Sequence, residues 1–408
     1  MEPIARPRRR TALVAVGALA FSLGAVPVEA NERVRPGMAP SGPCALPGYT
    51  GDVSEAMPTP HGYARSSGTV RALTLFIDFP DAPAEGSTRE RYAEFLPATT
   101  DYFAASSYGR LDYRPVPVHR WLRMSKPFAA YGIDRGTRWR EGSNRGYDLL
   151  IREIAAAVRG DIDFADYDLA NILVAPNAGP PATESVLSVS FAGYPLLPSL
   201  RNISFIWSRQ TGPSAFRVLP HENGHTFGLP DLYWTRKGKP PLLAGHWDVM
   251  ESDWGPTNDF LAWHKWKLGW LAADQTVCVT RSGVTEHRIT PSAHPNGLKL
   301  VALPIAPGQV LTLEVRTRSH LDQLVCRPGV LIARINTRAR SGQGPVRVSD
   351  SRPDSGGCLT RDDPSLHPEL TDAPYTPGDT YADHRTGIRA QILTATPTGT
   401  HRVRIIRP

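Results

Sequence analysis

The amino-acid sequence predicts a mixed α/β (α+β) domain followed by a smaller all-β sandwich or barrel. Two observations lead to this prediction. Apolar strand patterns alternate with helical periods up to residue 272, and beyond it only β-rich runs separated by turn residues follow. The chain has 408 residues, 41% apolar and 21% charged, which is enough to build a large core and excludes general disorder.

Residues 1–30 have the pattern of a secretory signal peptide. Four arginines precede an apolar stretch over 12–26, and Val28 and Ala30 place small residues at the −3 and −1 positions of a cleavage site. This stretch of 15 residues is short for a bilayer span, which argues against the alternative of an uncleaved anchor. We expect secretion with cleavage after Ala30, and no stable membrane anchor afterwards.

The charge distribution does not indicate a nucleic-acid partner. The formal net charge is +7, but only 6 of the 46 basic residues are Lys and the charges of the expected mature chain are scattered. We therefore expect no nucleic-acid binding, and we expect the protein to act as a monomer.

The expected elements of the first half follow in order. Residues 31–67 are rich in Pro, Gly and Ser and predict an extended N-terminal arm before a domain over 68–272. A near-continuous apolar run over 71–79 predicts a buried central strand, and 89–106 predicts one helix. Residues 112–124 alternate but contain Pro115 and Pro117, which indicates an irregular or edge strand.

Three further elements complete this domain. The period of 147–158 predicts a helix, 170–175 a short buried strand, and 202–207 an edge strand. Trp263, Trp266 and Trp270 have helical spacing, so we expect them in the core. Residues 273–408 then predict the β-domain, with strand patterns at 299–303, 310–315, 329–335 and 403–406.

The four cysteines favour two disulfides, because an even number in an exported chain is typical of disulfide pairing. None of them forms a CxxC pair, which argues against a cysteine zinc site. Four cysteines allow three pairings. Our prediction is Cys326 with Cys358 and Cys44 with Cys278. The alternative for Cys44 is to bind a zinc ion as a thiolate and so keep the protein latent.

The segment His221-Glu-Asn-Gly-His225-Thr-Phe-Gly228-Leu-Pro-Asp231 carries the chemistry. Residues four apart share one face of a helix, so His221 and His225 can present two imidazoles to one zinc ion. Glu222 is placed to act as a base for a water activated by the metal. Gly228 can end the helix and let Asp231 return as a third ligand. The alternative is a surface helix with two solvated histidines.

Pro220 directly precedes this motif and would kink a helix interior. The helix must therefore bend at Pro220, or Pro220 must lie near the first helical turn.

This motif, followed by Trp247-Asp-Val-Met250, resembles the metzincin zinc peptidases with their Met-turn. The match is closest to the M6 family, the immune inhibitor A-like peptidases, and it covers about residues 70–272. The further short signatures are Phe76-Ile-Asp-Phe-Pro-Asp81, Ser107-Tyr-Gly-Arg-Leu111, Gly245-His-Trp247 and Lys267-Leu-Gly-Trp-Leu271, with a weaker one at 329–335. The resemblance implies a metzincin-like catalytic domain and a secreted endopeptidase with protein or peptide substrates.

Carried over by position, the resemblance implies one catalytic Zn²⁺ held by His221, His225 and Asp231, with Glu222 as the catalytic carboxylate and Met250 beneath the metal. Some metzincins place a Tyr two residues after the Met, where this chain has Ser252, so the oxyanion helper is not identified.

His246 and Tyr233 flank the motif and are candidates for stabilising the oxyanion or contacting substrate. Packing in the core is the plainer role for either of them.

Calcium is a weaker expectation. Family members often carry an acidic loop with glycines, and this chain has Asp161, Asp163, Asp166 and Asp168 without them. A solvated acidic turn is the alternative.

Two other functions stay open at this point. One is a catalytically inactive binding protein on a peptidase scaffold, which the complete motif with Glu222 argues against. The other is a zinc hydrolase of a non-peptide substrate. The sequence leaves the cleavage specificity and the route of activation undetermined.

Overall fold

The computed structural model describes residues 39–133, 145–178, 186–193, 199–207, 214–237, 243–251, 259–359 and 368–408. They belong to a compact unit that spans 35–408. The predicted signal peptide and Ser252 lie outside the described residues. Within the described ranges, no helix has the length and apolar composition that crossing a bilayer requires. The fold is mixed α/β with several sheets and few helices, as the sequence predicts at this level.

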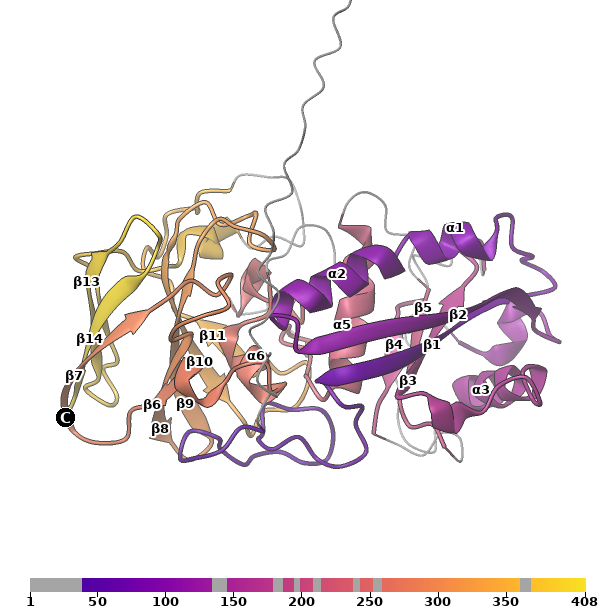
Figure 1. The fold of residues 1–408 in the computed structure, drawn as a ribbon, viewed down its shortest axis with the longest axis horizontal. Coiled ribbons are helices and arrows are strands. Elements are labelled where there is room, and N and C mark those ends of the chain that lie inside the picture. The colour runs from indigo at the N-terminus through magenta and orange to yellow at the C-terminus, as the bar shows by residue number, and fades with distance from the viewer. Residues whose placement is uncertain are drawn as a thin grey trace, which may run out of the picture. The chain divides into compact units, whose positions relative to one another are not determined.

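The first half is built on a five-stranded sheet in the order β2-β1-β3-β5-β4. Its strands are β1 (Gly68–Asp78), β2 (Leu111–Arg123), β3 (Leu169–Val174), β4 (Val189–Phe191) and β5 (Ile203–Ile206). Strands β1, β2, β3 and β5 are parallel, and β4 is antiparallel to β5 (Figure 1). The prolines of β2 are tolerated because β2 is an edge strand, as predicted.

Both faces of this sheet are buried, which explains the near-continuous apolar run of β1. Successive β1 side chains enter two separate cores, one containing Val70, Ala72 and Phe76 and the other Leu73, Leu75 and Ile77. The helices are α1 (Thr88–Ala93), α2 (Leu96–Ser106), α3 (Arg145–Ala157), α5 (Val218–Thr226) and α6 (Ala262–Lys267). Helices α2 and α5 contribute to the first core and α3 to the second, so the sheet lies between them.

Short 3₁₀ turns connect these elements, at Phe128–Tyr131, Phe164–Asp166, Ala215–Arg217, Gly245–Trp247, Ala273–Gln275 and Pro368–Asp372. The boundary that we predict after residue 272 falls at the fifth of them. The division into two domains stays a prediction.

Two sequence predictions in this half were wrong. The single helix expected over 89–106 is two helices, α1 and α2, because Pro97 lacks an N–H and is accommodated only in the first turn of a new helix. The strand predicted at 202–207 is not an edge strand, because β5 lies between β3 and β4. The edge is β4, whose three residues are too few to show a period in the sequence.

The second half consists of two sheets. One has the order β11-β10-β9-β8-β6 and the other β12-β13-β14-β7. Their strands are β6 (Thr276–Cys278), β7 (Gly283–Ile289), β8 (Leu300–Ala306), β9 (Gln309–Arg316), β10 (Gly329–Asn336), β11 (Val346–Val348), β12 (Thr380–Ala382), β13 (Arg389–Ala395) and β14 (His401–Arg407). Side chains such as Leu313 and Ile332 from the first sheet share a core with Ile392 and Ile405 from the second, so this half is a sandwich.

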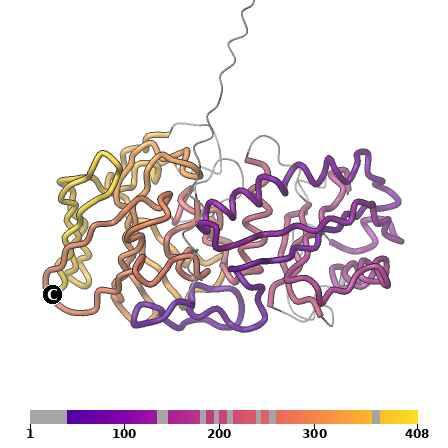
Figure 2. Tube along the Cα trace, viewed as in Figure 1, coloured from indigo at the N-terminus to yellow at the C-terminus, as the bar shows by residue number. Residues whose placement is uncertain are grey.

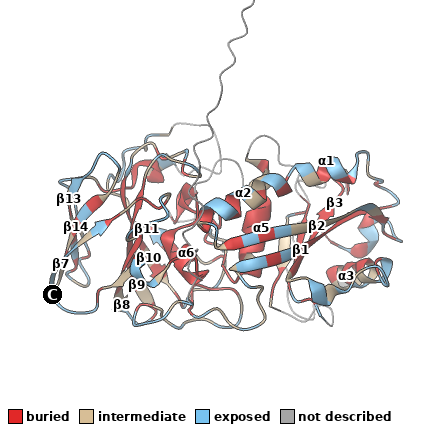
Figure 3. Ribbon diagram, in the orientation of Figure 1, coloured by how far each residue is buried: buried red, intermediate tan, exposed pale blue. Residues whose placement is uncertain are grey.

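The five-stranded sheet of the sandwich is also buried on its other face. Leu331, Ala333 and Ile335 of β10 belong to the same core as Trp247 and Met250 of the first half. Figure 3 shows the result, with buried segments through α5, α6 and β10 and more exposed residues along β7 and β13. The two halves therefore share one continuous apolar core.

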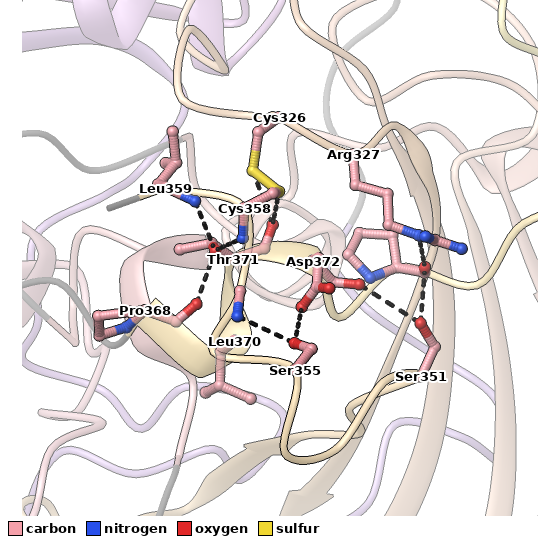
Figure 4. Close-up of a disulfide and its surroundings, with 12 residues drawn as sticks. Cys326, Arg327, Ser351, Ser355, Cys358, Leu359, Pro368, Leu370, Thr371 and Asp372 are labelled. Carbon is pink, nitrogen blue, oxygen red and sulfur yellow. Dashed lines mark hydrogen bonds between the residues drawn. A yellow bond between two sulfur atoms is a disulfide. The ribbon is translucent and has the colours of Figure 1, made fainter. Parts of the chain in front are cut away.

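Both predicted disulfides are present, Cys44–Cys278 and Cys326–Cys358. The first connects the N-terminal arm to the sandwich, and Figure 2 shows this arm running from there to β1. The second lies in a loop closed by Thr371, whose hydroxyl accepts the backbone N–H groups of Cys358 at 2.8 Å and Leu359 at 3.1 Å (Figure 4). Because Cys44 is oxidised, it is not a thiolate ligand.

A buried ion network fixes the arm to the first half. The His264 ring lies between Glu55 of the arm, at 2.9 Å, and Asp248, at 2.7 Å, and all three side chains are fully buried. Burial lowers the pKa of His264, but the carboxylates of Asp248 and Glu55 outweigh burial and raise it to about 10. His264 is therefore a buried cation shared by two carboxylates.

The raised pKa of His264 predicts a loss of stability in alkali. A group with an ordinary pKa of 6.5 and a folded value of about 10 contributes fully below pH 6.5, and its contribution is lost as pH rises through 10. We expect the free energy of unfolding, measured by denaturant titration, to fall over this window. His264→Gln should cost about 3–5 kcal/mol at pH 6.5, because two buried carboxylates lose their cation, and should flatten the pH dependence. His294→Gln, at an exposed position, is the control; an unchanged slope in His264→Gln would contradict the assignment.

Candidate metal centre

Helix α5 carries the motif and forms despite Pro220. Pro220 is the third residue of α5, in the first turn, where backbone N–H groups have no helical acceptor. The predicted alternative of a proline in the first turn is thus the one observed. Gly228 has φ +93° and a Cβ there would lie 2.4 Å from Thr59 Cγ2, so only glycine fits this turn. The chain then reverses and returns toward the helix.

The two histidines project from the same face of α5, with ring centroids 4.8 Å apart. His221 Nδ1 lies 2.9 Å from the carbonyl oxygen of Val249, and His225 Nδ1 lies 2.8 Å from that of Leu229. A carbonyl oxygen can only accept, so each Nδ1 carries a proton, and in the neutral imidazole each Nε2 presents a lone pair. Metal-bound histidines are commonly oriented in this way.

Asp231 faces the Nε2 atoms of both imidazoles. Its Oδ1 lies 3.4 Å from His221 Nε2 and 3.2 Å from His225 Nε2, and one ligand atom from each of the three residues lies within 4.8 Å of the others. Burial raises the pKa of Asp231, but the two imidazoles outweigh burial and hold it well below the ordinary value. The carboxylate is therefore ionised.

The atoms at this point can hold a metal ion. Asp231 Oδ1 is buried and faces both Nε2 atoms. A buried carboxylate needs a positive partner, which protons on the imidazoles or a metal ion between the three residues can supply. Two imidazoles and one carboxylate are a ligand set that zinc accepts in catalytic sites. His221, His225 and Asp231 are the only such group among the residues that the structure describes.

Glu222 points to the sheet edge and is 4% exposed. Ser190 Oγ of β4 lies 2.7 Å from Glu222 Oε2 and 2.8 Å from the Glu222 carbonyl oxygen. Ser204 of β5 lies 2.8 Å from Ser190 Oγ and connects it to the Asn223 side chain at 3.2 Å. Ser190 was not predicted as a site residue, because its only signal in the sequence is a polar residue within an apolar three-residue strand.

Met250 lies against α5 at Gly224. A Cβ on Gly224 would be 2.4 Å from Met250 Sδ, so the side chain packs directly on the backbone between the two histidines. Asp248 Oδ1 accepts the Met250 N–H at 2.8 Å, and Met250 O accepts the Leu232 N–H at 3.0 Å. The turn at 248–250 therefore holds both the histidine helix and the segment that bears Asp231.

The two helper candidates have different surroundings. The Tyr233 ring stacks parallel to His221 with centroids 6.3 Å apart, and the side chain is 37% exposed. His246 is fully buried, with its ring 4.7 Å from that of Trp247. Tyr233 is thus beside the group of His221, His225 and Asp231 with access to solvent, whereas His246 is packed in the core.

Three of the four acidic residues considered for calcium have local partners for their side chains. Asp161 pairs with Arg120 at 2.6 Å, Asp168 pairs with Arg65 at 2.7 Å, and Asp163 accepts the Ala165 N–H. Calcium binding there is not supported by these contacts, and it stays an expectation from the sequence.

A scan against models of known protein families finds no match for this chain, and no curated protein matches it significantly. The likeness to M6 peptidases thus remains a resemblance of short motifs.

The packing of Met250 on Gly224 predicts that Gly is more stable than Ala at position 224, which is the reverse of the usual order in a helix. In a helix interior, Ala is usually better than Gly by about 0.5–1 kcal/mol. Gly224→Ala should instead destabilise the protein by about 1–3 kcal/mol, because the new Cβ overlaps Met250 Sδ. In a Met250→Ala background the same change should be neutral or favourable, as measured by denaturant titration. An equal cost in both backgrounds would refute the contact.

Proposed function

We propose that this chain is a secreted zinc-dependent endopeptidase. The observation that carries the proposal is the convergence of His221 Nε2, His225 Nε2 and Asp231 Oδ1 next to the buried carboxylate of Glu222. Two disulfides support export, because such bonds persist in oxidising compartments. The signal-peptide pattern of residues 1–30 supports the same destination.

Zinc would be held by His221, His225 and Asp231. When bound, it supplies a Lewis acid that makes water more acidic and polarises a carbonyl group. The Glu222 carboxylate accepts a proton from the attacking water and returns it to the leaving amine. Tyr233, stacked beside His221, is the better placed of the two oxyanion candidates because its side chain reaches solvent.

A peptide substrate is favoured by the edge strand β4. Among the residues that the structure describes, this strand pairs with β5 alone and is the last in its sheet. Its central residue, Ser190, contacts Glu222, so the strand runs past the base. An extended peptide that added to β4 would bring its backbone to the site through main-chain hydrogen bonds.

The two alternatives are separable by one assay. The purified chain is incubated with casein, with and without a chelator and with zinc added back. Proteolysis that depends on zinc supports the proposal. Bound zinc without proteolysis favours a non-peptide hydrolase, and the absence of both zinc and proteolysis favours an inactive binding protein.

Glu222→Gln should retain zinc and lose at least 99% of the proteolytic activity, roughly the 10²-fold or more that a positioned base contributes. The amide is similar in size to the carboxylate and leaves all three proposed ligands in place. Zinc content by metal analysis and casein turnover are measured on the same sample. Glu251→Gln, outside the proposed ligand set, is the control for a buried Glu-to-Gln change, with any effect on folding checked by circular dichroism. Full proteolysis by Glu222→Gln would overturn the proposed role of Glu222.

Ser190→Ala should lower kcat by about 10- to 100-fold, the worth of one hydrogen bond to a charged group, while zinc affinity is unchanged. Ser190→Thr retains the hydroxyl and should recover most of the rate. On the residual activity of Glu222→Gln, Ser190→Ala should have a much smaller effect. A similar loss in both backgrounds would mean that Ser190 acts on something other than the base.

A further inference from the structure

We propose that the C-terminal β half completes the metal centre, with Ser341 as the positioning residue for Asp231. Ser341 lies in the loop between β10 and β11, and it is 110 positions away from Asp231 in the chain. This inference rests on the proposed function, because it assumes that Asp231 is a metal ligand.

The two carboxylate oxygens of Asp231 have different partners. Ser341 Oγ accepts the Asp231 backbone N–H at 2.9 Å. The same hydroxyl donates its hydrogen to Asp231 Oδ2 at 2.8 Å. Oδ2 is therefore engaged, and Oδ1 is the oxygen that faces His221 and His225. One serine thus fixes both the backbone and the rotation of the carboxylate.

The loop that carries Ser341 is attached to the Asp231 segment along its backbone. The Gly342 N–H donates to Asp231 O at 3.0 Å, and the Thr235 N–H donates to Gly342 O at 2.9 Å. Trp234 and Gln343 form an isolated antiparallel bridge. Gly342 has φ +69°, and a Cβ there would lie 2.6 Å from Thr235 Cγ2, so this close approach requires glycine.

The loop is also fixed to the sandwich. The Asn336 N–H at the end of β10 donates to Pro345 O at 2.7 Å, directly before β11, and closes the loop at its base. Strands β10 and β11 pair through Ala333, Arg334 and Ile335. The position of Ser341 is therefore set by the sandwich, and the third ligand is oriented by a part of the chain that contributes no ligand itself.

Removing the hydrogen-bond partner of a metal ligand commonly weakens metal binding by 10- to 100-fold. Ser341→Ala leaves His221, His225 and Asp231 unchanged but frees the carboxylate to rotate. We expect the zinc dissociation constant of the full chain, measured at 25 °C by competition with a chromophoric chelator, to rise 10- to 100-fold. Ser319→Ala, at a serine of the same half whose hydroxyl contacts Thr317 in its own loop, is the control and should leave it unchanged.

A pair of equal-sized variants isolates the hydroxyl. Ser341→Thr keeps the hydroxyl and should bind zinc close to wild type, whereas Ser341→Val should resemble Ser341→Ala. If Ser341→Ala folds poorly, the comparison of Ser341→Thr with Ser341→Val still measures the effect of the hydroxyl on zinc affinity. In an Asp231→Ala background, Ser341→Ala should have no further effect on zinc affinity. A merely structural role would weaken zinc binding equally in both backgrounds and would overturn the inference.

The failures of the two proposals are distinguishable. If Asp231→Ala weakens zinc binding and Ser341→Ala does not, the inference is wrong and the proposed function stands. If the wild-type chain binds no zinc, or if Asp231→Ala leaves its affinity unchanged, the proposed ligand set fails and the inference falls with it.

Discussion

The site depends on one buried charge, the carboxylate of Asp248. A buried carboxylate is tolerated only if it is hydrogen-bonded and paired with a cation. Asp248 receives the backbone N–H groups of Met250 at 2.8 Å and Leu261 at 2.7 Å, and it pairs with His264. These bonds fix the turn that places Val249 O against His221 and Met250 against Gly224. His264 in turn binds Glu55, so the N-terminal arm is part of the same network.

The sandwich contributes a second buried charge that reaches the same turn. The Arg316 guanidinium of β9 donates to the carbonyl oxygens of Trp247 and Asp259, both at 3.1 Å, and pairs with Asp322 and Glu314. Arg316 therefore holds the turn that contacts His221, and Ser341 holds Asp231. Both residues come from the sandwich, which shares a continuous core with the first half. Movement between the halves would displace Asp231 relative to the imidazoles.

The sequence predicted those features of the site that have a local period, and it missed those that do not. The spacing of His221 and His225 is a helical repeat, and Gly228 is recognisable as a helix end. The contacts of Ser190, Ser341 and Glu55 join residues 32, 110 and 209 positions apart, and such separations leave no pattern in a single sequence. The same reason explains why β4 was missed and β5 was wrongly placed at the edge. Strand order is a tertiary property, and three residues are too few for alternation to show.

The two carboxylates of the site are arranged by the same device. Asp231 has Oδ2 bound by the hydroxyl of Ser341, and Glu222 has Oε2 in hydrogen-bond contact with Ser190. A serine hydroxyl stabilises a carboxylate without neutralising it, since it donates one hydrogen and brings no charge. Lys or Arg at either place would compete with a metal ion for the negative charge. Neutral donors on both carboxylates are thus compatible with the proposed roles of Asp231 as a metal ligand and Glu222 as a base, and both donors lie outside the sequence motif.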